Sequence, residues 1–228
     1  MIRRLTIPWP SLRAERSGER GTVSRLLAVS DEQDPALESA DVRASIGPVD
    51  AILGCGDLEP GYLAMLGDAF MAPLIFVRGN HDRGLGWREQ SHVLPDCLPD
   101  GRPTLLADTR LVGLSWPGRH DGRAEHDDGA AWRQAIGLAI RLAGRGREPL
   151  LVISHAPPEG AGDTPDDPYH RGFAAYRWLA ERIRPPLWLH GHAQVAGRHS
   201  LVERLGPTTL VNVTGAALIE LVPEAVGR

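Results

Sequence analysis

The sequence predicts an α/β domain with a mixed β-sheet or two stacked sheets. In the first third of the chain, short apolar runs typical of buried strands alternate with helical patterns. Further along, strand-like segments become more frequent than helical ones. Acidic, amide and histidine residues directly follow several apolar runs. Because a rigid sheet fixes the loops at its strand ends, this arrangement also predicts a functional site.

The first half of the domain is expected to contain three strands and two helices. The predicted strands are residues 26–29, 51–53 and 74–77. A helix is expected to open at Asp34-Pro35, because proline is favoured in the first turn of a helix. A second helix is predicted for residues 60–70.

The second half is predicted to be rich in strands. These strands are expected at residues 104–107, 111–116, 150–153, 187–189, 209–213 and 217–221. Apolar residues near helical spacing predict a helix at 132–142, and residues 173–183 form an amphipathic pattern.

The domain organisation follows from length and composition. The chain has 228 residues, enough for one domain with a full core. Residues 23–228 are predicted to form this domain, and residues 1–22 an N-terminal extension of irregular structure, rich in Arg, Ser, Pro and Gly. The only cysteines, Cys55 and Cys97, form no CxxC motif, which fits a reducing compartment.

Side chains of the types that bind metals follow five of the predicted strands. These side chains are Asp31, Asp57, Asn80, His155 and His192. Carboxylate, amide oxygen and imidazole are ligand types for Mn²⁺, Fe, Zn²⁺ or Mg²⁺. A carboxylate such as Asp57 can bridge two metals about 3.5–4 Å apart, and such a pair makes hydroxide available near neutral pH.

Residues next to these ligands are candidates for catalysis and substrate binding. His81 follows a predicted ligand and is expected to protonate the leaving oxygen, a role that contributes about 10²–10⁴ in rate. Asp82 is expected to orient His81. Arg78 is either a phosphate contact or a surface arginine.

The order of the motifs resembles the calcineurin-like metallophosphoesterase superfamily over roughly residues 24–222. The motifs are Ser30-Asp31, Gly56-Asp57, Gly79-Asn80-His81-Asp82, Ser154-His155 and Gly191-His192-Ala193-Gln194. The resemblance implies an αββα sandwich, in which two mixed sheets are flanked by helices, with a dinuclear metal site at the strand ends.

The same resemblance implies how the ligands divide between the two metals. One metal is expected on Asp57, Asn80, His155 and His192. The other is expected on Asp31, Asp57 and two histidines, but this chain has Gln33 and Gln194 at the histidine positions. The second site is either rebuilt with oxygen ligands, including Gln33, Gln194 and Asp34, or weak or empty. Oxygen ligands favour Mn²⁺ or Mg²⁺ over Zn²⁺, so we expect Mn²⁺, with one strong and one weakened site.

Several of these residues and loops also have an interpretation that involves neither a metal nor a substrate. Asp57 could cap a helix, and His155 and His192 could be buried core histidines. The loop at residues 159–172 is either a lid over the substrate, in which His170 contacts the substrate, or a solvated loop. His120 and His126 are expected in a solvated loop.

The sequence thus predicts a cytoplasmic, metal-dependent phosphoesterase. The net charge of −4 and the absence of a basic groove argue against long nucleic acids, so the expected substrate is a phosphodiester or a small phosphorylated metabolite. No apolar run is long enough to cross a membrane. The alternative is a catalytically weak member that senses a phosphate or nucleotide ligand. The oligomeric state is left open.

Overall fold

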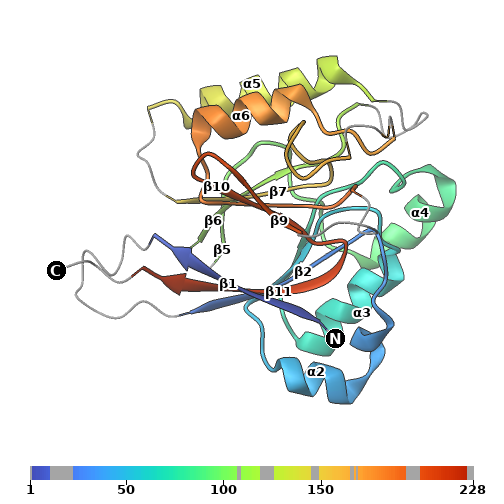
Figure 1. Cartoon of the computed structure of the whole chain (residues 1–228). Helices are drawn as coiled ribbons and strands as arrows, with labels where there is room; N and C mark the ends of the chain where they lie inside the picture. The colour runs from blue at the N-terminus through green and yellow to red at the C-terminus, as the bar shows by residue number, and fades with distance from the viewer. Residues whose placement is uncertain are drawn as a thin grey trace.

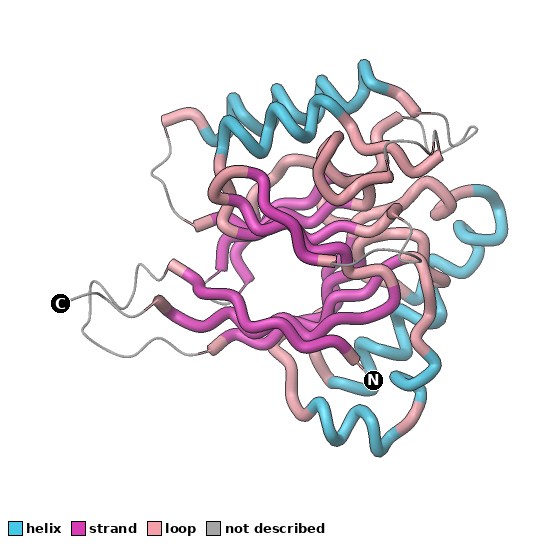
Figure 2. The backbone as a smooth tube through the Cα atoms, viewed as in Figure 1, coloured by secondary structure: helices cyan, strands magenta, loops and turns pink. Residues whose placement is uncertain are grey.

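Two mixed β-sheets stack face to face between two layers of helices (Figures 1 and 2). The computed structural model describes residues 2–10, 23–106, 109–118, 126–144, 149–164, 167, 169–193 and 201–224. This architecture confirms the predicted sandwich of two mixed sheets flanked by helices.

The first sheet has the strand order β1-β11-β2-β3-β4. Its strands are β1 (Arg3–Trp9), β11 (Gly215–Pro223), β2 (Ser24–Ser30), β3 (Ala51–Gly54) and β4 (Leu74–Phe76). Strands β2, β3 and β4 are parallel to one another, and β11 runs antiparallel to β2. The carboxyl ends of β2, β3 and β4 therefore lie at the same edge of the sheet.

The second sheet has the order β5-β6-β7-β8-β10-β9. Its strands are β5 (Thr104–Leu106), β6 (Thr109–Leu114), β7 (Leu150–Ser154), β8 (Leu187–His190), β10 (Thr208–Asn212) and β9 (Val202–Leu205). The four central strands, from β6 to β10 in this order, are parallel. Both sheets thus present parallel strand ends on which a site can be built.

Helices cover the outer face of each sheet (Figure 1). They are α2 (Ala40–Ile46), α3 (Pro60–Phe70), α4 (Gly84–Gln90), α5 (Asp128–Leu142) and α6 (Ala174–Ile183), with the 3-10 turns η1 (Pro35–Glu38) and η2 (Ser91–Val93). The predicted helix at 60–70 is confirmed. Helix α5 begins earlier than predicted, because the Asp127 carboxylate caps it by accepting the Ala130 N–H at 2.8 Å. No helix in the described part of the chain is long and apolar enough to cross a bilayer.

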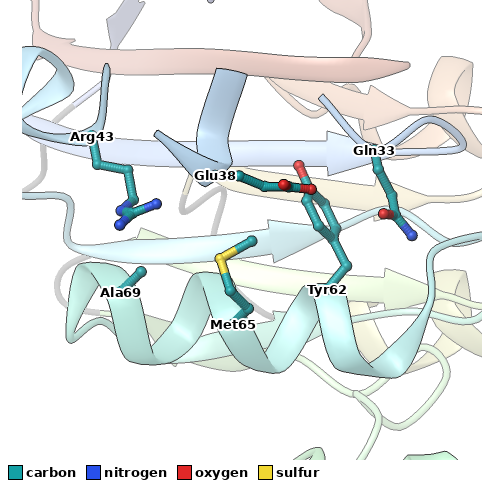
Figure 3. A pocket seen from close by; sticks show the side chains of 6 residues that line it. All are labelled: Gln33, Glu38, Arg43, Tyr62, Met65 and Ala69. Atoms are coloured by element: carbon teal, nitrogen blue, oxygen red, sulfur yellow. The ribbon is translucent and has the colours of Figure 1, made fainter. Parts of the chain in front are cut away.

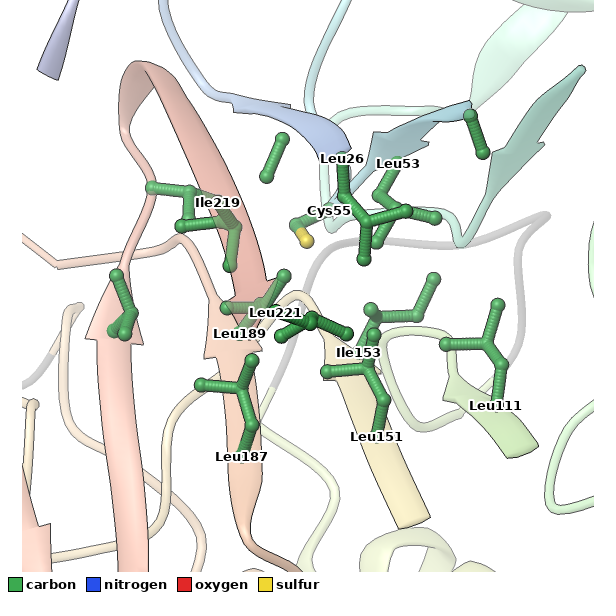
Figure 4. Packing of buried hydrophobic residues seen from close by; sticks show 14 of the residues in the cluster. Leu26, Leu53, Cys55, Leu111, Leu151, Ile153, Leu187, Leu189, Ile219 and Leu221 are labelled. Atoms are coloured by element: carbon green, nitrogen blue, oxygen red, sulfur yellow. The ribbon is translucent and has the colours of Figure 1, made fainter. Parts of the chain in front are cut away.

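The main core lies between the two sheets (Figure 4). Successive side chains on a strand point to opposite faces, so Leu26 and Leu53 enter this core while Leu27 and Ile52 pack under the α2–α3 layer. Opposite them, Leu151 and other side chains of the second sheet fill the same core. Each fully buried Leu or Ile contributes about 1.5–3 kcal/mol, so this layer holds the two sheets together.

Residues 3–9 correct the prediction of an irregular N-terminal extension. They form the edge strand β1, which pairs in parallel with β11, and Ile7 and Trp9 are buried in the core between the sheets. Pro8 fits here because an edge strand can leave one side without ladder hydrogen bonds. Residues 11–22 of the predicted extension lie outside the described residues.

Candidate metal centre

Parallel strand ends from both sheets bring the predicted ligands together. Ligand atoms of Asp57, His155 and His192 all lie within 4.8 Å of one another. Asp57 lies in the loop after β3, whereas His155 and His192 follow β7 and β8 of the second sheet. The predicted gathering of these side chains is therefore present in the structure, at the edge where the two sheets meet.

Asn80, in the loop after β4, completes the cluster. Its Oδ1 lies 2.7 Å from Nε2 of His155, and Oδ2 of Asp57 lies 3.1 Å from the same nitrogen. The other ring nitrogen of His155, Nδ1, lies 2.8 Å from the carbonyl oxygen of Cys55, which fixes the orientation of the imidazole. The result is a small cluster of two oxygen and two nitrogen donors.

Charge is concentrated in this cluster. Burial disfavours protonation of His155, but Asp57 and then Asp31 outweigh it and raise the pKa of His155 to about 9. Burial likewise opposes ionisation of Asp57, yet His155 lowers the pKa of Asp57 to about 2. These opposite shifts reflect the attraction between the His155 ring and the Asp57 carboxylate, so the oxygens of the cluster stabilise positive charge at this position.

His192 fits a metal ligand more closely than a core histidine. Burial, and then the charge of His155, lower the pKa of His192 to about 2, so its imidazole is neutral. Its Nε2 is buried and has no hydrogen-bond partner among the described residues. A buried polar atom without a partner costs about 1–3 kcal/mol, whereas a cation within reach of Asp57 and His155 would accept its lone pair. The residues present therefore fit a divalent cation.

Three residues in or near the cluster have strained backbone angles. Asp31, Asp57 and His192 have left-handed backbone angles, with φ of 59°, 57° and 52°. Such conformations cost about 1–3 kcal/mol for residues other than glycine and concentrate at functional sites. The close packing explains the glycines of the motifs, since a Cβ at Gly79 would overlap the Asp57 carboxylate.

Asp82 connects two loops of the cluster. Its Oδ2 accepts the backbone N–H of Asp57 at 2.9 Å and that of Gly79 at 2.7 Å, so it joins the two loops that carry Asp57 and Asn80. Burial, and then the charge of Asp57, raise the pKa of Asp82 to about 6. These two hydrogen bonds go to backbone groups, and the expectation that Asp82 orients His81 stays a prediction.

His81 and Arg78 lie beside the cluster in the same loop. His81 is exposed, and its backbone N–H donates to Oδ1 of Asp57 at 2.7 Å. The guanidinium of Arg78 lies 4.8 Å from the centre of the Trp87 ring, and its backbone N–H donates to the Ser115 hydroxyl. The proton-donor role of His81 and the phosphate contact of Arg78 remain predictions.

The described part of the 159–172 loop packs against the centre. The His170 ring lies 5.4 Å from that of His192, and its Nδ1 is 2.6 Å from Oδ2 of Asp167. Asp163 is buried and accepts the backbone N–H groups of Gly160 and Gly172. Of the two alternatives for this loop, the packing agrees better with a lid over the substrate than with a solvated loop. It also places His170 beside the candidate ligand His192.

Of the two glutamines expected at the second metal, only Gln33 is described by the structure. Gln33 is exposed and lines a pocket of about 480 Å³ with Glu38, Arg43, Tyr62, Met65 and Ala69 (Figure 3). No described hydrogen bond joins Gln33 to Asp57, His155 or His192. Gln194 lies outside the described residues. The structure thus gives no support to Gln33 as a ligand and does not address Gln194.

Aromatic residues that the sequence analysis missed form one wall of the centre. The Trp116 ring lies 4.6 Å from that of His192 and 5.9 Å from that of His155. Phe173 packs on Trp116, and His126 stacks on Phe173 at 3.9 Å, which contradicts its assignment to a solvated loop. The available signal was the position of Trp116 just after β6, where the neighbouring strands carry ligands. The other histidine assigned to that loop, at position 120, lies outside the described residues.

Comparisons with known proteins agree with this geometry. A family model described as calcineurin-like phosphoesterase matches residues 25–196. One solved structure is 15% identical, with 87% of this chain and 95% of that chain covered and a TM-score of 0.63. The protein TT1561 of Thermus thermophilus is 18% identical, with coverages of 85% and 90% and a TM-score of 0.56.

At such low identities the two solved structures show only the likeness of fold. The comparison with curated proteins finds no match. The family match spans more than half of the chain and includes the residues gathered at the strand ends. The chain therefore belongs to the calcineurin-like phosphoesterase family, which binds divalent metals.

Proposed function

We propose that this protein is a metal-dependent phosphoesterase that hydrolyses a phosphodiester or a small phosphorylated metabolite. The observation that carries the proposal is the convergence of Asp57, Asn80, His155 and His192. In the described part of the chain, the buried Nε2 of His192 also has no hydrogen-bond partner. These four side chains would hold the ion. When bound, a divalent ion such as Mn²⁺ supplies Lewis-acid chemistry that acidifies water and offsets the negative charge of a phosphoryl group.

The neighbouring residues would carry out the remaining steps. His81 is exposed, and its backbone N–H donates to Asp57, which supports a role for its imidazole as the proton donor to the leaving oxygen. Asp82 keeps the His81 loop and the Asp57 loop in register. His170, on the loop that packs over His192, is proposed to contact the substrate.

The substrate class follows from the charge of the chain. A net charge of −4 offers no general attraction to a long polyanion, which favours a small phosphorylated molecule in the cytoplasm.

The proposal is tested with p-nitrophenyl phosphodiesters and monoesters in the presence of Mn²⁺. We expect the metal-loaded protein to hydrolyse at least one of these esters and the Asp57→Asn variant to lose both metal and activity. Binding of metal and phosphate without turnover would support the alternative of a phosphate sensor. Failure of the protein to bind any divalent metal would overturn the proposal.

A further inference from the structure

The ring of Trp116 contacts both candidate histidine ligands. Trp116 follows β6 and is only 3% exposed, so its indole belongs to the protein interior. The centre of its ring lies 4.6 Å from that of His192 and 5.9 Å from that of His155, with an edge-on arrangement in both pairs. The two imidazoles themselves lie 4.8 Å apart. One rigid aromatic ring therefore limits the positions that both imidazoles can occupy.

Two hydrogen bonds tie the Trp116 segment to the loop that carries Asn80. The Trp116 N–H donates to the carbonyl oxygen of Arg78 at 2.7 Å, and the Arg78 N–H donates to the Ser115 hydroxyl at 3.2 Å. Trp116 follows a strand of the second sheet, whereas Arg78 and Asn80 follow β4 of the first. The Trp116 segment thus connects the loop of one candidate ligand with the rings of two others.

A polar network holds the residue before Trp116 on both sides of its main chain. The Ser115 N–H donates to Oδ1 of Asp100 at 2.7 Å, and the Ser115 carbonyl oxygen accepts Nε2 of Gln134 at 3.1 Å. Nε2 of Gln134 also donates to Oδ2 of Asp100 at 2.9 Å, and Oε1 of Gln134 accepts the hydroxyl of the fully buried Tyr176 at 2.7 Å. Gln134 lies on α5 and Tyr176 on α6, so the outer helix layer of the second sheet fixes the Trp116 segment (Figure 1).

We propose that Trp116 is a positioning residue of the metal centre and that Gln134 acts through it. The inference rests on the proposed metal centre and names residues that set its affinity. An imidazole binds an ion well when its surroundings hold the ring in the orientation that directs the lone pair at the ion. The ring of His155 has the Cys55 carbonyl as a partner on Nδ1, and Trp116 packs against both this ring and that of His192.

Substitutions at two positions separate positioning from a purely structural role. Trp116→Leu removes the aromatic contact with both imidazoles, and Trp116→Phe keeps a smaller ring. Gln134→Leu keeps a side chain of similar size and removes the hydrogen bonds of the amide group. Trp132→Leu is the matched control, because Trp132 is 37% exposed and packs on Trp178 of α6. Circular dichroism and urea denaturation of the metal-free proteins establish that each variant is folded.

The measurements are the dissociation constant of the tightest-bound Co²⁺ and the visible spectrum of the Co²⁺-loaded protein, which reports the geometry of the ligands. Trp116→Leu should weaken binding by about 10–100-fold, the usual effect of removing a group that orients a ligand, and should shift the spectrum. Trp116→Phe and Gln134→Leu should weaken binding by a smaller factor, up to about 10-fold. Trp132→Leu should keep the wild-type constant and spectrum.

A double-mutant cycle tests whether Gln134 acts through Trp116. In the Trp116→Leu background, Gln134→Leu should no longer change the Co²⁺ dissociation constant, because the group that it positions is already absent. A Gln134→Leu variant that binds like wild type, or one whose effect persists undiminished in the Trp116→Leu background, would overturn the role given to Gln134.

A folded Trp116→Leu protein with the wild-type Co²⁺ constant and spectrum would overturn the inference and leave the proposed phosphoesterase function intact. If Trp116→Leu does not fold, Trp116→Phe decides alone, and an unchanged constant and spectrum in that variant would overturn the inference. A wild-type protein that binds no Co²⁺ would overturn the proposed metal centre itself.

Discussion

Nε2 of His155 lies 2.7 Å from Oδ1 of Asn80, although the two residues follow strands of different sheets. Asn80 follows β4 of the first sheet, and His155 follows β7 of the second. The candidate metal centre therefore spans the interface between the sheets, and a bound ion would link them.

Because of this link, binding of a divalent ion should stabilise the whole fold. At a free concentration of about 100 times the dissociation constant, a ligand of the native state adds about 2.7 kcal/mol to the free energy of unfolding. For a protein of this size the melting temperature should rise by about 5–10 °C. Thermal denaturation with Mn²⁺ and with a chelator checks this. A similar rise in the Asp57→Asn variant would place the stabilising ion elsewhere.

His81→Ala should lower the rate of phosphoester hydrolysis and leave the metal content unchanged. The exposed imidazole is assigned to proton transfer, and removal of such a group typically lowers kcat by about 10²–10⁴. His92→Ala is the control, because His92 is an exposed histidine whose described ring contact is the Glu89 carbonyl. Steady-state kinetics and elemental analysis of both variants are the measurements. If His81→Ala loses the metal, His81 is a ligand and the assignment fails.

Asp82→Ala should destabilise the protein even without metal. The backbone N–H groups of Asp57 and Gly79 would lose their shared acceptor, and each buried unpaired group costs about 1–3 kcal/mol. We expect the free energy of unfolding in urea to fall by about 2–4 kcal/mol. The fall should be smaller for Asp82→Asn, which keeps an acceptor oxygen. Asp68→Ala, on the exposed face of α3, is the control. Equal stability of Asp82→Ala and this control would refute the bracing role.

Trp9→Ala tests whether β1 belongs to the folded core. Trp9 is 6% exposed and packs between the sheets, so its truncation should lower the free energy of unfolding by about 3–5 kcal/mol. Thr6→Ala, at an exposed position of the same strand, should change it by less than about 0.5 kcal/mol. Urea denaturation compares the two. An effect of Trp9→Ala as small as that of Thr6→Ala would mean that β1 does not contribute to the core in solution.

The sequence predicted the cluster because its ligands directly follow apolar strands. Asp57, Asn80 and His155 each come within a few residues of a strand end, and parallel strand ends meet at one edge. Strand β1 was missed because arginines and Pro8 obscure the pattern in which apolar Leu5, Ile7 and Trp9 occupy every second position. This pattern identifies a strand only once β11, from the other end of the chain, is known to pair with it.

The contacts between loops could not be predicted from the sequence. The bonds of Asp82 to two backbone N–H groups, and those of Asp31 to His192, depend on how distant loops approach each other. Trp116 carries no metal-binding chemistry, so a search for ligands passes over it despite its position just after a strand, and its contact with His192 appears only in the folded chain. The sequence therefore indicates which residues have the chemistry, whereas the folded chain determines which of them meet.

The most direct test of the metal centre is anomalous diffraction from a crystal soaked in Mn²⁺. The strongest anomalous peak should lie within about 2.0–2.3 Å of the donor atoms of Asp57, Asn80, His155 and His192. A strongest peak at any other position, or no peak among these four side chains at saturating Mn²⁺, would contradict the account.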